Sequence, residues 1–128
     1  MPLAQSAAIA ACAALAGLAA FQAALISGAP LGRLAWGGQY DVLPARLKVG
    51  SAVSIVLYAV FGYVALAKAN LMPPLGGDSV ISTAAWVLTG YFALGVLMNA
   101  LSRSKPERAV MTPVALFLAA AYLVLAIT

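Results

Sequence analysis

Apolar residues run through this chain in four long blocks that contain no charged side chain. The blocks are residues 3–32, 50–67, 79–102 and 109–128. Residues 55–61 are apolar at every position, whereas a barrel strand would alternate apolar and polar residues. A helix needs about 20 residues to cross the roughly 30 Å hydrocarbon core of a bilayer. The pattern therefore predicts an all-α integral membrane protein, a bundle of four transmembrane helices at about 4–27, 45–68, 79–102 and 107–127.

The whole chain, residues 1–128, is expected to form a single transmembrane domain. Apolar residues make up 65% of it and charged residues 8%, so four spans and their connections leave no length for a soluble domain. No Lys or Arg precedes the first apolar block, which is also longer than the apolar core of a secretory signal peptide. We therefore interpret this first block as a membrane span.

Basic residues predict the orientation of the bundle. Six of the seven Lys and Arg residues lie in or beside two connections, the one between spans one and two and the one between spans three and four. Only Lys68 lies on the opposite side. Because Lys and Arg are enriched in cytoplasmic loops, these two connections should face the cytoplasm and both termini should face outward. The formal net charge of +4 then reflects topology and attraction to anionic lipids, and we expect no nucleic-acid partner.

The connection between the first two spans, residues 28–44, is chemically the richest segment. Four glycines and two prolines prevent a regular helix, yet its Leu and Trp side chains are too apolar for a freely solvated loop. This Gly-rich cytoplasmic loop is predicted to fold back against the mouth of the bundle, with Trp36 and Tyr40 at head-group depth. An arginine partner is expected for Asp41, the only acidic residue of the loop, and the candidates are Arg33, Arg46 and Arg103.

The spacing of small and polar residues predicts which helix faces meet. In span two, Ser51, Ser54, Tyr58 and Gly62 recur at three- and four-residue steps, so they form one face that should pack against another helix. Span one has Ala or Gly at most positions, which allows close helix contact. It should lie either at the centre of the bundle or at a dimer seam.

The start of span four has the pattern of a capping box. Ser104 is expected to cap the helix, and Glu107, three residues later, is expected to reach back to the backbone amide of Ser104. Glu107 is therefore interpreted as a helix-start residue and not as a catalyst.

The predicted topology brings polar residues together at one end. Because successive spans run in opposite directions, the polar residues of the spans gather in the cytoplasmic half, next to the Gly-rich loop. We predict a polar vestibule there, which serves either for hydrogen bonds between helices or for ligand binding. The candidate ligand-binding residues are Gln22, Arg33, Trp36, Gln39, Asp41, Ser54, Asn99 and Arg103.

The residue types that are absent exclude several classes of chemistry. The chain has no histidine and one cysteine, which excludes histidine-ligated haem or zinc and any multi-cysteine metal site. No Asp, Glu, Lys or Arg is expected at mid-membrane depth, which argues against proton-coupled transport and intramembrane proteolysis. We therefore expect no enzymatic activity, no metal and no cofactor.

Two loops also carry recognisable motifs. In the first loop they are Gly28-Ala29-Pro30-Leu31-Gly32, Ala35-Trp36-Gly37-Gly38-Gln39 and Val42-Leu43-Pro44 with Arg46. Around the third connection they are Asn99-Ala100-Leu101-Ser102-Arg103-Ser104-Lys105 and Glu107-Arg108. These segments resemble the loops of a family of small uncharacterised four-helix bacterial membrane proteins. The resemblance implies the four-helix fold and the bacterial inner membrane, and it implies no activity.

Two functions are compatible with these features. The first is binding or passive conduction of a small molecule, lipid or ion through the vestibule, in a homo-oligomer surrounded by membrane lipids. In this hypothesis two arginines attract an anionic group, amide side chains donate hydrogen bonds and Trp36 covers the apolar part. The alternative is a non-catalytic accessory or scaffold subunit, which docks on a membrane-protein partner through span one and the small face of span two. A single narrow bundle without coupling charges is unsuited to active transport, and we favour binding or passive conduction over the accessory role.

Overall fold

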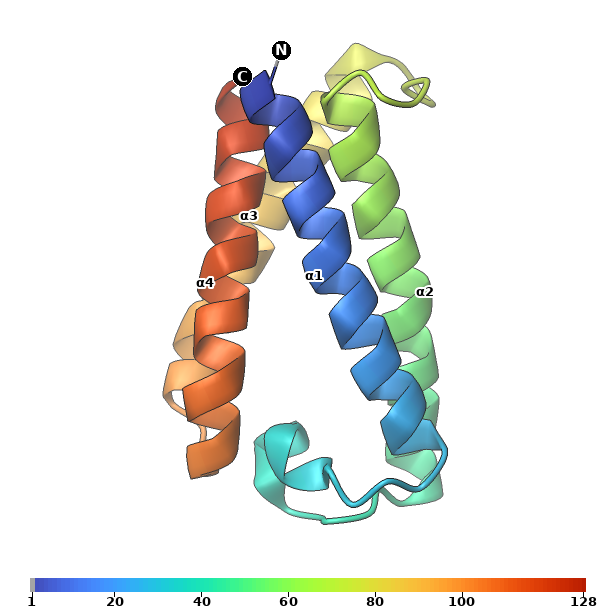
Figure 1. Cartoon of the computed structure of the whole chain (residues 1–128), viewed down its shortest axis with the longest axis vertical. Coiled ribbons are helices and arrows are strands. Elements are labelled where there is room, and N and C mark those ends of the chain that lie inside the picture. Colours follow the sequence, from blue (N-terminus) through green and yellow to red (C-terminus); the bar gives the residue numbers. More distant parts are fainter. Residues whose placement is uncertain (1) are drawn as a thin grey trace.

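The chain folds into four long helices that run roughly side by side (Figure 1). The computed structural model describes residues 2–128. The all-helical prediction is confirmed, and each predicted span agrees with a helix to within two residues at either end. The helices are α1 (Pro2–Ile26), α2 (Ala45–Lys68), α3 (Asp78–Ala100) and α4 (Lys105–Ile127).

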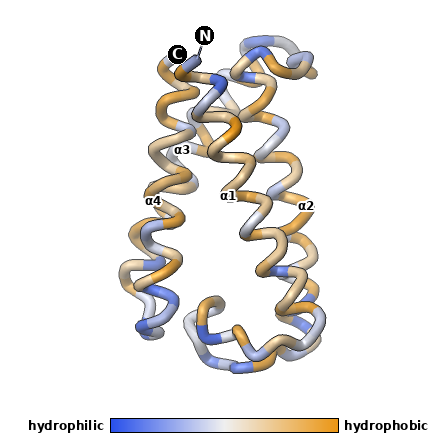
Figure 2. The backbone as a smooth tube through the Cα atoms, in the orientation of Figure 1, coloured by the Kyte–Doolittle hydropathy of each residue, from blue (hydrophilic) through white to orange (hydrophobic). Residues whose placement is uncertain are grey.

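Each helix is long and apolar enough to cross a membrane. Many of the large apolar side chains, such as Val56, Val87 and Leu116, are exposed on the outside of the bundle. Figure 2 shows hydrophobic residues along the length of the helices and hydrophilic residues toward the two ends. A soluble protein rarely exposes so extended an apolar surface, whereas the hydrocarbon core of a membrane accommodates it.

The helices form two hairpins, α1 with α2 and α3 with α4, that touch at one end and separate at the other (Figure 1). Contacts within each hairpin are more extensive than those between hairpins, which α1 makes mainly with α4 and α2 with α3. We call the end at which α1 begins and α4 ends the termini end. The opposite end, where the α1–α2 and α3–α4 connections lie, is the loop end.

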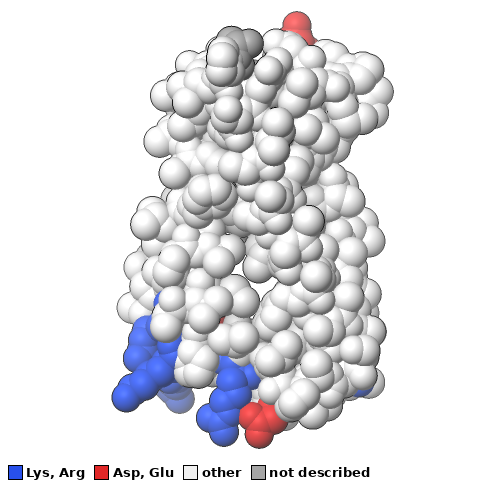
Figure 3. Space-filling model, viewed as in Figure 1, with Lys and Arg blue, Asp and Glu red and all other residues white. Residues whose placement is uncertain are grey.

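The predicted gathering of basic residues at one end is visible in the fold. The two connections that carry six of the seven Lys and Arg residues both lie at the loop end, and Figure 3 shows the blue side chains there. The surface between the two ends is white in this view, which means that it presents neither acidic nor basic groups.

Small residues allow the helices to pack closely in the half nearest the termini end. Ala8 and Ala11 of α1 and Ala85 of α3 are fully buried, together with Leu118 and Leu125 of α4. In a membrane, such close contact stabilises a bundle through dispersion forces, because lipid provides little hydrophobic drive between helices. The prediction that span one uses its small residues for helix contact is thus confirmed.

An aromatic cluster joins both hairpins near the middle of the bundle. Phe61 of α2 and Tyr91 and Phe92 of α3 contact each other edge to face, with ring centroids 5.2 to 5.8 Å apart. Tyr122 of α4 stacks on Phe92 at 5.4 Å and donates a hydrogen bond of 2.5 Å from its hydroxyl to the carbonyl oxygen of Phe61. The Tyr122 side chain is completely buried and is the largest such side chain of the described residues, so this cluster holds the two hairpins together at the centre of the fold.

Candidate functional site

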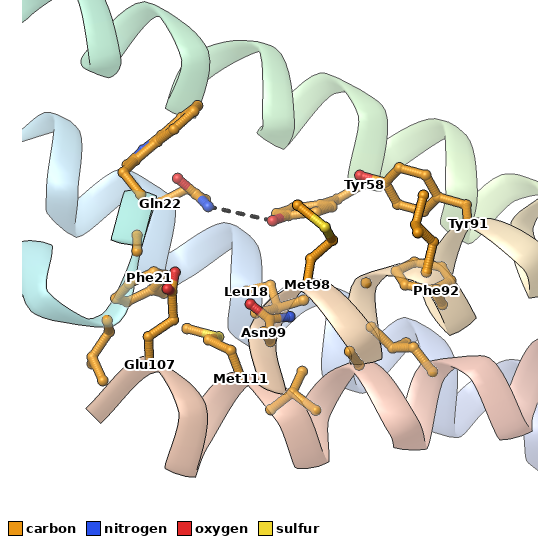
Figure 4. A pocket seen from close by; sticks show the side chains of 18 residues that line it. Leu18, Phe21, Gln22, Tyr58, Tyr91, Phe92, Met98, Asn99, Glu107 and Met111 are labelled. Carbon is orange, nitrogen blue, oxygen red and sulfur yellow. Dashed lines mark hydrogen bonds between the residues drawn. The ribbon is translucent and has the colours of Figure 1, made fainter. Parts of the chain in front are cut away.

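A cavity with a volume of about 420 Å³ lies between the two hairpins toward the loop end. All four helices and the Gly-rich loop contribute to its lining, and Figure 3 shows the surface hollowed in this region. Most of the lining is apolar, with Phe21 of α1, Met98 of α3 and Met111 of α4 among the larger side chains (Figure 4). Small-molecule sites typically have volumes of roughly 300 to 1,000 Å³ and a similarly apolar lining.

The aromatic cluster closes the cavity toward the termini end. Tyr91 and Phe92 line the cavity, and the fully buried Tyr122 packs behind Phe92. On α4 the lining extends to Leu118, and Ala121 and Leu125 beyond it belong to the buried core. The cavity is therefore a pocket with one closed end.

The Gly-rich loop lies across the other end of the cavity. It contains two short 3-10 helices, η1 (Gly32–Leu34) and η2 (Trp36–Gly38), and residues 34–36 line the cavity. The hydroxyl of Ser104, at the start of α4, donates a 2.5 Å hydrogen bond to the carbonyl oxygen of Arg33. The prediction that this loop folds back against the bundle is confirmed.

The backbone of Trp36 adopts an unusual conformation in this loop. Its φ angle is 54°, a left-handed conformation that a bulky residue rarely adopts. The indole packs on the first turns of α2, where a Cβ atom on Gly50 would lie only 2.8 Å from the ring. Strained backbone of this kind persists where the surrounding contacts hold it, and it is common at ligand clamps.

Exposed polar contacts order the outer side of the loop. The guanidinium of Arg33 donates from Nε to Asp41 Oδ1 at 2.8 Å, so Arg33 is the partner expected for Asp41. Arg46 instead donates to the hydroxyl of Tyr40 at 2.9 Å. Because Arg33 and Asp41 are well exposed, their ion pair contributes at most about 1 kcal/mol to stability.

Gln22 brings an amide into the cavity from α1. Its side chain is only 8% exposed, and its Nε2 atom donates a 3.3 Å hydrogen bond to the hydroxyl of Tyr58 on α2 (Figure 4). Within residues 2–128, its Oε1 atom has no hydrogen-bond partner. Because the tyrosine hydroxyl can donate as well as accept, turning the amide over would leave the nitrogen unpaired instead. One polar atom of this buried amide is thus unpaired among the described residues in either orientation.

Glu107 is the second buried polar group of the cavity. Ser104 caps α4 as predicted, accepting a 3.4 Å hydrogen bond from the backbone amide of Glu107. The other half of the predicted capping box is wrong. The amide of Ser104 donates to the hydroxyl of Ser102 at 3.1 Å, and that hydroxyl in turn donates to Glu107 Oε1. With Ser102 in between, the carboxylate does not reach the Ser104 amide and lies at the cavity wall, where it is only 8% exposed.

The structure brings together three of the eight residues predicted to bind a ligand, namely Gln22, Trp36 and Asn99. The hydroxyl of Ser54 donates at 3.0 Å to the carbonyl oxygen of Gly50, within α2, and Ser54 is outside the lining. The remaining four are exposed at the loop end and also lie outside the lining, and they are Arg33, Gln39, Asp41 and Arg103.

Several lining residues were not predicted from the sequence. Tyr58 was expected on the small face of α2, and that face does pack on α1, since a Cβ atom on Gly62 would meet Cys12 Sγ at 3.6 Å. Met98 and Met111 could not be predicted as lining residues, because an apolar residue in a span can face lipid, a neighbouring helix or a cavity. Glu107 could have been recognised as a candidate, because it and Asp41 are the only carboxylates next to a span at this end. The capping-box pattern instead led to its interpretation as a helix-start residue.

Comparison with known proteins yields no match to a family model, a curated protein or a solved structure. Within residues 2–128, the structure contains no group of three or more His, Cys, Asp and Glu side chains that could hold a metal ion. The candidate site is an apolar pocket with amide, hydroxyl and carboxylate groups in its wall, an arrangement that can bind and orient a small molecule.

Proposed function

We propose that this chain is a multi-pass protein of the bacterial inner membrane that binds a small amphipathic molecule between its two hairpins. The observation that carries the proposal is the cavity of about 420 Å³, which is mostly apolar and has polar groups on its loop-end side. Those groups are Gln22, Asn99 and Glu107. A molecule with an apolar body and one small polar head would match this lining, because a few polar groups in an apolar pocket orient a ligand.

The closed end of the cavity favours binding over passive conduction. A conducting path would have to continue through the aromatic cluster, where Tyr122 is completely buried and hydrogen-bonded to the Phe61 carbonyl. The packing there is mainly aromatic, and the hydroxyl of the buried Tyr122 is already engaged with the Phe61 carbonyl, so it offers little to replace the hydration shell of an ion.

The distribution of charge supports a cytoplasmic position for the loop end. Six of the seven Lys and Arg residues lie there, which the positive-inside rule associates with the cytoplasm. In this orientation both termini face outward and the cavity lies in the cytoplasmic half of the membrane. A membrane-dissolved or cytoplasmic amphiphile would then reach it near the basic loops.

The alternative role as an accessory subunit has less support. The small face of α2, expected as a docking surface for that role, packs on α1 through Tyr58 and Gly62 within the chain. It is therefore unavailable to a partner protein while the bundle is intact.

Filling the cavity will weaken binding of an amphiphilic probe. Val114 lines the cavity on α4, whereas Val110, one turn earlier, is exposed and outside the lining. We expect Val114→Phe to lower octanol affinity about tenfold or more, since its ring displaces at least two ligand methylenes worth about 0.8 kcal/mol each. The matched Val110→Phe should leave affinity unchanged.

Octanol binding can be followed by the fluorescence of Trp36, which lines the cavity. Trp86, the other tryptophan, is exposed on α3 and outside the lining, so Trp86→Phe provides a single-tryptophan background. Both phenylalanine variants are measured in nanodiscs of the same lipid, so partitioning of octanol into the bilayer cancels from the ratio of affinities. Equal affinities in the two variants would contradict the proposed site.

A further inference from the structure

We infer that the ligand of this cavity carries a cationic amino group, and that the carboxylate of Glu107 holds it. The inference rests on the proposed binding function and adds the chemical class of the head group to it. It follows from two features of the cavity wall: a buried carboxylate that lacks a counter-ion, and an aromatic ring and an amide in place of basic side chains.

Glu107 is buried without a positive partner. Its side chain is 8% exposed, and the hydrogen bond from Ser102 reaches only one of its two carboxylate oxygens. Among residues 2–128, the Arg33–Asp41 contact is the only ion pair, and it is exposed. Arg108, the basic residue next to Glu107 in the chain, directs its Nη1 to the carbonyl oxygen of Ser102 at 2.8 Å instead. A buried carboxylate is costly unless it is paired, so this position favours a cation supplied by a ligand.

The rest of the cavity wall suits a cation and not an anion. No Lys or Arg is part of the lining, whereas Phe21 presents an aromatic ring to it near Glu107 (Figure 4). The negative faces of such rings attract ammonium groups. Asn99 lines the same cavity, and its amide oxygen can accept a hydrogen bond from an amine (Figure 4).

This geometry changes the head group expected from the sequence. Arg33 and Arg103 were expected to attract an anionic group, but both lie outside the lining and Arg33 is engaged with Asp41. The apolar body of an amine ligand would extend from Glu107 toward Phe92, along Met111 and Leu118.

Three probes with eight carbon atoms each and different head groups test the inference: octylamine, octanol and octanoate. Their affinities are measured by Trp36 fluorescence in the Trp86→Phe background, in nanodiscs of zwitterionic lipid at neutral pH. We expect octylamine to bind most tightly and octanoate most weakly. Glu107→Gln should lower octylamine affinity about tenfold or more, the value of a charge-assisted hydrogen bond, and change octanol affinity little.

Two further variants control for charge and folding. Asp78→Asn makes the same change of charge at the first turn of α3, at the termini end and outside the lining, and should leave all three affinities unchanged. Glu107→Asp keeps the charge on a shorter side chain and should retain the preference for octylamine. If Glu107→Gln does not fold, the order of affinities of octylamine, octanol and octanoate for the protein with Glu107 unchanged still tests whether the pocket prefers an amino group.

The possible results separate the inference from the proposed function. If none of the three probes binds, the proposed function fails. If octanol or octanoate binds as tightly as octylamine, or if Glu107→Gln weakens all three equally, the pocket binds amphiphiles but the inference about the amino group is overturned.

Discussion

Replacing Gly32 with alanine will release the Gly-rich loop from the mouth of the cavity. A Cβ atom on Gly32 would lie 2.0 Å from the carbonyl oxygen of Tyr40 and 2.8 Å from that of Asp41. Both are backbone atoms and cannot rotate away. The Gly32 amide also donates a 2.8 Å hydrogen bond to the Asp41 oxygen, which the displaced backbone would lose. We expect a cost of about 3 kcal/mol or more, the upper end of the range for overpacking.

Fluorescence of Trp36 reports this change directly. In the Trp86→Phe background, Gly32→Ala should shift the emission to longer wavelength as the indole leaves Gly50 for water, and octanol affinity should fall about tenfold or more. Gly17→Ala is the matched control, because a Cβ there meets no atom within 4 Å and alanine favours a helix by about 1 kcal/mol. An unshifted emission in Gly32→Ala would contradict the described closure of the loop.

Truncation of Tyr122 to alanine will cause a still larger loss of stability. The ring is completely buried, stacks on Phe92 and links α4 to α2 through its hydroxyl. Removing a buried aromatic side chain costs about 3 to 5 kcal/mol when the surroundings cannot collapse. Tyr122→Phe should cost only about 1 kcal/mol. The Phe61 carbonyl oxygen loses the bond from the tyrosine hydroxyl but keeps the hydrogen bond from a backbone amide within α2.

Reversible unfolding in mixed micelles of detergent and dodecyl sulfate measures these differences. Phe117→Ala is the matched control, because Phe117 is an exposed aromatic residue on the same helix and outside the aromatic cluster. Its free energy of unfolding should change by less than about 1 kcal/mol. A loss for Tyr122→Ala no larger than that for Phe117→Ala would show that the cluster is not the centre of the fold.

The local sequence was sufficient to predict the bounds of the helices and the folding back of the Gly-rich loop. Span two was predicted at 45–68 and α2 has these bounds, because Pro44 ends the loop and Lys68 ends the apolar block. The folding back of the loop followed from apolar residues such as Leu34 and Trp36 between glycines. The packing face of α2 was also predictable, since helical spacing places Tyr58 and Gly62 on one side.

The composition of the site was less predictable, because it depends on how the two hairpins diverge. Gln22, Trp36 and Asn99 were found because polar or aromatic residues are conspicuous in an apolar chain. The prediction that Arg33 and Arg103 bind a ligand is not supported by the lining. Both residues lie next to the mouth of the cavity, but a position in a loop does not determine whether a side chain enters the cavity. Glu107 fitted a local helix-start pattern, and only the hydrogen bond from Ser102 shows where its carboxylate lies.

The sequence by itself determined four apolar helices, two basic connections at one end and a loop too apolar to stay in solvent. These properties depend on hydropathy and on charge along the chain, so neighbouring residues are sufficient to predict them. Only the tertiary structure decided that the hairpins separate below the aromatic cluster, and that Glu107 lies buried without a counter-ion in the resulting cavity. The physical reason is that burial and pairing depend on residues distant in the chain, and the free energy of a buried charge depends on all of them together.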